Sequence, residues 1–98
     1  MANLDDFERT LAFVETLRGR HAEQVRTLRR IEREWLREIG KSMDNLSDEE
    51  FHRYLTLRSG IFSMQARVKW CDEAMNLIRA RIAVIRSRKE TKKPRSAR

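Results

Sequence analysis

Apolar residues recur along the chain at alternating spacings of three and four positions, which is the period of an α-helix with one buried stripe. In the first half the stripe consists of Leu4, Phe7, Leu11, Val14, Val25, Leu28, Trp35 and Ile39, interrupted by Arg18, His21 and Glu32. In the second half it is unbroken and consists of Tyr54, Leu57, Ile61, Met64, Val68, Cys71, Met75, Ile78, Ile82 and Ile85. The pattern therefore predicts two long amphipathic helices.

The ends of the first helix are marked by residues that suit helix termini. Asn3 can accept hydrogen bonds from the free N–H groups of the first turn, with Asp6 at the third helical position. Gly40 can end the helix because glycine adopts the left-handed conformation without a Cβ clash. We therefore expect the first helix to cover about residues 3–40.

The start of the second helix is the clearest local signal in the chain. Ser47-Asp48-Glu49-Glu50 fits a capping box, in which the serine bonds forward and Glu50 reaches back. The helical period then continues to about residue 88, so the second helix is predicted at about 47–88. The segment 91–98, which contains Pro94, is expected to be a flexible basic tail.

The connection at 41–46 is short, which predicts that the two helices are antiparallel neighbours. Laying one stripe against the other places Trp35 beside Tyr54. The same alignment places Arg18 beside Asp72, and Glu32 beside Arg58. The predicted fold is therefore all-α: residues 1–90 form a long antiparallel two-helix hairpin resembling a coiled coil.

A second, sparser apolar line lies on the second helix away from the buried stripe. It consists of Leu55, Phe62, Trp70, Leu77 and Val84. Exposed aromatic residues in a line are typical of an interface, so these five are the candidate partner-binding residues. Either the chain forms a homodimer, and so a four-helix bundle, or the line docks on another protein. Alternatively, a break at Gly60 would let a third helical segment cover the line.

The net charge of +7 is concentrated at the C-terminal end. Residues 79–98 carry nine basic residues and one acidic residue, whereas residues 1–78 are close to neutral. Such an arm suits a nucleic acid, a membrane surface or an acidic protein, although a tail that only confers solubility would look the same.

Arginine outnumbers lysine 17 to 5, and its planar fork binds phosphate or carboxylate through two hydrogen bonds. The candidate residues for an anionic partner are Arg26, Arg30, Arg33, Arg37, Arg88, Lys89, Lys92, Lys93, Arg95 and Arg98. The simpler interpretation of the four arginines on the first helix is an ordinary solvent-exposed face. On that face Glu34 would pair with Arg30 or Arg37, and Glu23 with Arg26.

Residues that could carry chemistry are few and scattered. His21 and His52 are predicted at opposite ends of the hairpin, and the single cysteine, Cys71, lies in the buried stripe. No phosphate-binding glycine loop, nucleophile elbow or zinc-ligand spacing is present in the sequence. We therefore expect no catalytic residues, no metal and no cofactor.

The chain contains no apolar run long enough to span a membrane. Its acidic start does not suit a secretory signal, and a single cysteine fits a reducing compartment, so the cytoplasm is expected. The predicted function is a non-enzymatic helical interaction module: an adaptor, chaperone or inhibitor of a larger bacterial or phage machine. The alternative is a nucleic-acid-binding helical dimer that uses the basic arm and the arginines of the first helix.

Overall fold

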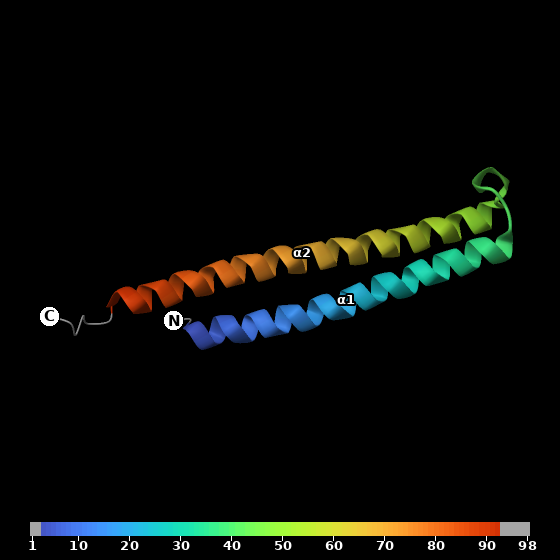
Figure 1. Cartoon of the computed structure of the whole chain (residues 1–98). Coiled ribbons are helices and arrows are strands. Elements are labelled where there is room, and N and C mark those ends of the chain that lie inside the picture. The colour runs from blue at the N-terminus through green and yellow to red at the C-terminus, as the bar shows by residue number, and fades with distance from the viewer. Residues whose placement is uncertain (1–2, 93–98) are drawn as a thin grey trace.

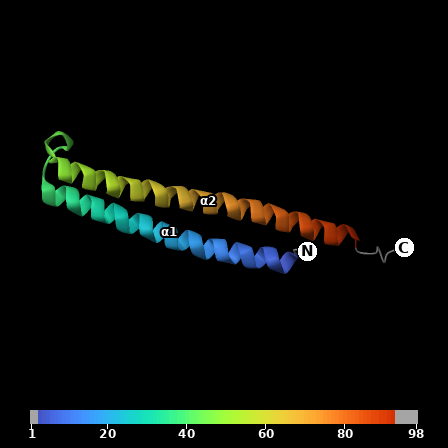
Figure 2. The same ribbon diagram turned by 180° about the vertical axis from the view of Figure 1, so that it is seen from behind.

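The computed structural model describes residues 3–92 of the chain, and side chains for residues 3–89. Helix α1 (Leu4–Ile39) and helix α2 (Asp48–Lys92) pack side by side and antiparallel, joined by a single 3-10 turn, η1 (Met43–Asn45) (Figure 1). The hairpin measures 80 × 19 × 17 Å. Seen from behind, α1 and α2 again lie side by side (Figure 2). The predicted all-α hairpin is thereby confirmed, and residues 3–92 contain no strand.

Both ends of α1 are capped as the sequence predicts. The side chain of Asn3 accepts a hydrogen bond from the backbone N–H of Asp6, and the Asp6 carboxylate accepts one from the backbone N–H of Asn3. At the other end Gly40 has φ +59° and donates its N–H to the carbonyl of Leu36. Glycine is needed there because a Cβ is disfavoured in this left-handed conformation.

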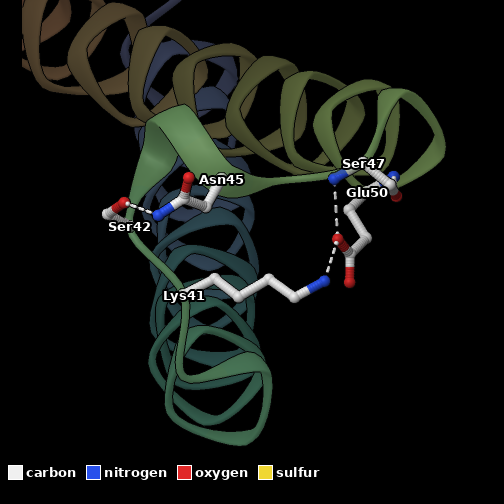
Figure 3. Close-up of polar contacts among 5 residues, drawn as sticks. All are labelled: Lys41, Ser42, Asn45, Ser47 and Glu50. Carbon is white, nitrogen blue, oxygen red and sulfur yellow. Dashed lines mark hydrogen bonds and ion pairs between the residues drawn. The ribbon is translucent and has the colours of Figure 1, made fainter.

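The turn end of the hairpin is held by a polar cluster around the start of α2 (Figure 3). Glu50 donates its backbone N–H to the Ser47 hydroxyl, and its carboxylate accepts the N–H of Ser47 at 2.8 Å, which completes the predicted capping box. The same carboxylate accepts a hydrogen bond from Lys41 at 3.0 Å. The backbone bond from Ser47, followed by the one from Lys41, lowers the pKa of Glu50 below its ordinary value. The contact with Lys41 ties the segment just after α1 to the first turn of α2.

The core is a single seam between the two helices. Its most completely buried side chains are Val14, Ile61, Cys71 and Ile82. Near the turn Trp35 stacks on Tyr54, with ring centroids 6.1 Å apart, which confirms the predicted pairing. A two-helix hairpin can bury only one stripe per helix, which is why so few side chains are fully enclosed.

Polar pairs across the seam fix the register. Arg18 on α1 donates to the carboxylate of Asp72, and Arg58 on α2 donates to Glu32 at 3.0 Å; both pairs were predicted. The hydrogen bond to Asp72 raises the pKa of Arg18. Nearer the open end, Arg86 reaches Glu8 at 3.1 Å. Pairs of this kind select one alignment where a uniform apolar seam would accept several.

One alternative and one predicted boundary differ from the structure. Helix α2 runs through Gly60 without a break, so the described chain has no third helical segment to cover the outer line. A Cβ at Gly60 would lie 3.5 Å from Leu28, so the glycine sits where α1 packs against α2 and does not terminate a helix. Helix α2 also continues to Lys92, past its predicted end near residue 88. The remainder of the predicted tail, residues 93–98, lies outside the described residues.

Candidate interaction surfaces

All five residues of the predicted apolar line are exposed on α2. Phe62 exposes 60% of its surface and Trp70 58%, and Leu55, Leu77 and Val84 are also exposed. Removing large apolar side chains from water lowers the free energy. Exposed patches of such side chains therefore mark interaction sites. We call these five residues the outer line.

The part of the outer line nearest the turn is joined to a cationic group. The guanidinium of Arg58 lies over the ring of Phe62, 5.0 Å from its centroid. Arg58 also bonds Glu32 on α1, so the same side chain links the seam to the outer line. The sequence pattern gave Arg58 only its seam role, because a contact with Phe62 depends on the side-chain rotamer.

The middle of the outer line borders a shallow groove between the helices. Its walls are Leu17, His21, Ala66, Arg67, Trp70 and Cys71. Leu17 also lines a second depression on α1, together with the exposed Phe13. The apolar surface therefore continues from Trp70 on α2 across the seam to Phe13 on α1. This continuity could not be seen in the sequence, because it depends on how the two helices pack.

Two residues of this groove, Cys71 and His21, are of types that can take part in catalysis or metal binding. Cys71 is 1% exposed, so its sulfur packs inside the seam. His21 is half-buried, and its Nδ1 lies 3.3 Å from the side-chain oxygen of Gln24. The other histidine, His52, lies near the start of α2, and its Nδ1 lies 2.7 Å from the backbone carbonyl oxygen of Asp48. Within residues 3–89 no three potential metal-binding side chains come together.

Four of the arginines predicted to bind an anionic partner lie on α1 and are exposed. Arg26, Arg30, Arg33 and Arg37 fall on the side of α1 that faces away from the seam. We call these four residues the arginine ridge. If the ridge were only a solvent-exposed face, three local ion pairs would be predicted. The structure forms the one between Arg26 and Glu23. Glu34 forms no ion pair with Arg30 or Arg37 among the described side chains.

The basic arm is only partly described. Arg88 and Lys89 are exposed near the end of α2, and Lys92 is its last helical residue. Lys93, Arg95 and Arg98 lie outside the described residues. Neither α1 nor the described part of α2 includes a stretch apolar and long enough to cross a bilayer.

Comparison with known proteins relates the chain to a described family. The model of a family described as virulence activator alpha C-term matches residues 1–79, which cover α1, the turn and most of α2. No curated protein and no solved structure matches the chain.

Proposed function

The chain belongs to the virulence activator alpha C-term family, and from that premise we propose that it is a non-enzymatic interaction module of a transcription-related regulator. It works by self-association: the outer line on α2 of one copy packs against the outer line of a second copy. The observation that carries the proposal is the exposed row of large apolar side chains along α2.

The spacing of the outer line supports a second copy as its occupant. Leu77 and Phe62 lie seven and eight residues on either side of Trp70, and Val84 and Leu55 lie fourteen and fifteen residues away. The line is therefore nearly symmetric about Trp70. A two-fold axis there, with the two α2 helices antiparallel, sets every apolar residue opposite another apolar residue. A self-complementary surface of this kind is what a two-fold dimer requires.

The distribution of charge supports the same orientation. Residues 41–50, at the turn, contain one basic and four acidic residues, a net charge of −3. Residues 3–10 and 79–89, at the open end, contain six basic and three acidic residues, a net charge of +3. Antiparallel copies bring each turn end beside the open end of the partner. Parallel copies would bring like charges together, which disfavours that arrangement.

The mutation that tests the proposal is Trp70→Ala. A tryptophan carries roughly 150–250 Å² of surface, of which 58% is exposed here. Covering it in both copies removes about 200 Å² from water, worth about 5 kcal/mol at about 25 cal/mol/Å². Even if half of this is realised, the variant dimerises at least about fiftyfold more weakly.

The measurement is sedimentation equilibrium of the full chain over a range of concentrations. We expect a dimer for the parent chain and a shift toward monomer for Trp70→Ala. Ile31→Ala with Met43→Ala is the matched control, because both residues are exposed and apolar but lie off the outer line. A monomeric parent chain, or equal behaviour of the Trp70 variant and the control, would contradict the proposal.

Orientation is tested separately by oxidative cross-linking. Leu55→Cys together with Val84→Cys is expected to give a disulfide-linked dimer, and Leu55→Cys alone is expected to give none. A dimer from Leu55→Cys alone would instead indicate parallel copies. Cys71 stays in place in these variants because it is buried.

A further inference from the structure

The arginine ridge is a strip of like charge on the outside of the hairpin. Its four residues occur at spacings of four, three and four positions, which stack on one side of a helix. All four are exposed. They lie on α1, whereas the outer line lies on α2, so covering the outer line leaves the ridge open.

The acidic residues of the same segment neutralise only part of the ridge. Glu32 faces the seam, where it bonds Arg58. Glu23, Glu34 and Glu38 share one flank of α1, and of these Glu23 bonds Arg26. Among the described side chains no carboxylate pairs with Arg30, Arg33 or Arg37. Three guanidinium groups therefore present their donors to solvent.

This arrangement opposes helix formation. Like charges three or four positions apart in a helix destabilise it by about 0.2–0.5 kcal/mol per pair, and the ridge contains three such pairs in succession. Because Arg30, Arg33 and Arg37 have no carboxylate partner among the described side chains, a ligand of opposite charge could relieve this repulsion.

The chemistry and dimensions of the ridge fit a phosphate backbone. Arginine forks bind phosphate oxygens through paired hydrogen bonds. From Arg26 to Arg37 the ridge is about 16 Å long at 1.5 Å per residue. Each strand of a DNA duplex carries one phosphate per about 3.4 Å of the duplex axis, so a ridge of this length can reach several phosphates. No apolar side chain projects among the four arginines, which disfavours insertion into a lipid surface.

We propose that the arginine ridge is a sequence-independent binding surface for the phosphate backbone of duplex DNA. The proposed contacts are to phosphate oxygens, which carry no sequence information. This binding does not require self-association, since the ridge is complete within one chain.

The test is fluorescence anisotropy with a fluorescein-labelled, random-sequence duplex of about two helical turns, at salt concentrations between about 50 and 200 mM. The ridge variant carries Arg26→Gln, Arg30→Gln, Arg33→Gln and Arg37→Gln. The control variant has the same net charge and carries Arg9→Gln, Arg20→Gln, Arg67→Gln and Arg81→Gln, all at exposed positions. Glutamine and arginine have similar helix propensities, so both variants should remain helical, which circular dichroism verifies.

We expect the parent chain to bind with an affinity that falls steeply with salt. Losing four phosphate contacts reduces the slope of log K against log salt by about 3 to 4. The ridge variant should bind at least about tenfold more weakly than the control variant at the same salt concentration. Poly-glutamate with the same total negative charge as the duplex is expected to displace the labelled DNA poorly.

Three outcomes would overturn the proposal. Equal losses in the two variants would mean that net charge alone governs binding. If the parent chain binds DNA with an affinity that does not depend on salt, or does not bind DNA at all, the ridge does not contact phosphates. Effective competition by poly-glutamate would assign the ridge to an acidic protein surface.

Discussion

Replacing Gly60 by alanine should stabilise the hairpin, although the residue lies in the middle of the helix–helix contact. Gly60 is within α2, and Gly40 is the one residue with positive φ among those the structure describes. An added Cβ would meet Leu28 Cδ1 at 3.5 Å, an ordinary van der Waals contact that requires no movement. Alanine in a helix interior is favoured over glycine by about 0.8–1.0 kcal/mol. The expected gain is therefore about 1 kcal/mol.

The assay is thermal unfolding followed by far-UV circular dichroism, at one protein concentration because self-association would shift the midpoint. For a domain of this size 1 kcal/mol raises the Tm by roughly 4–8 °C. Gly19→Ala is the matched comparison, since a Cβ there meets nothing within 4 Å and reports helix propensity alone. Gly40→Ala should lower stability by about 1–2 kcal/mol, because alanine is strained in the left-handed conformation.

The changes in Tm of the three glycine variants, taken together, test this reasoning. If Gly60→Ala lowers the Tm while Gly19→Ala raises it, the helices approach each other at Leu28 more closely than the structure indicates. If Gly40→Ala leaves the Tm unchanged, the left-handed cap is absent in solution.

Three further predictions concern the core and the turn. Ile61→Ala should lower the free energy of unfolding by about 2–5 kcal/mol in urea titrations, because Ile61 is 1% exposed and its loss leaves a cavity; a loss under 1 kcal/mol would show that the seam recloses. The lowered pKa of Glu50 means that its stabilising effect is complete above the ordinary value and is lost as the pH falls through the lower folded value. The acid-induced decrease in Tm should therefore be shallower in Glu50→Gln than in the parent chain, and identical profiles would refute this. The Cys71 thiol should react with a thiol reagent only at the rate of unfolding, so rapid labelling of the native chain would contradict its burial.

Most of the fold could be predicted because its determinants are local or periodic. The caps at Asn3, Gly40 and Ser47 depend on a few neighbouring residues, and each forms as expected. The pairs Arg18–Asp72 and Glu32–Arg58 follow from a single alignment of the two stripes. The 3-10 turn and the bond from Lys41 to Glu50 were not predicted, because they depend on the path of a six-residue connection.

The candidate surfaces were predictable in position but not in shape. Periodicity identifies Trp70 as off the seam, yet only the packed structure shows that Leu17 connects it to Phe13 on the other helix. Likewise, the sequence allows Glu34 to pair with Arg30 or Arg37, since both spacings are suitable. Which side chains pair is decided by rotamers, and in the structure Arg30 and Arg37 remain without an acidic partner among the described side chains.

The four ion pairs that join α1 to α2, or tie the turn end together, have a consequence for how the chain folds. Lys41 and Glu50 are 9 residues apart in sequence, Glu32 and Arg58 26, Arg18 and Asp72 54, and Glu8 and Arg86 78. The entropy lost in closing a loop grows with its length, so the pair nearest the turn closes first at the lowest cost. Each closed pair then shortens the loop that the next must close. The hairpin should consequently form like a zipper from the turn, and contacts at the open end, including Glu8 with Arg86, should be the last to form and the first to open.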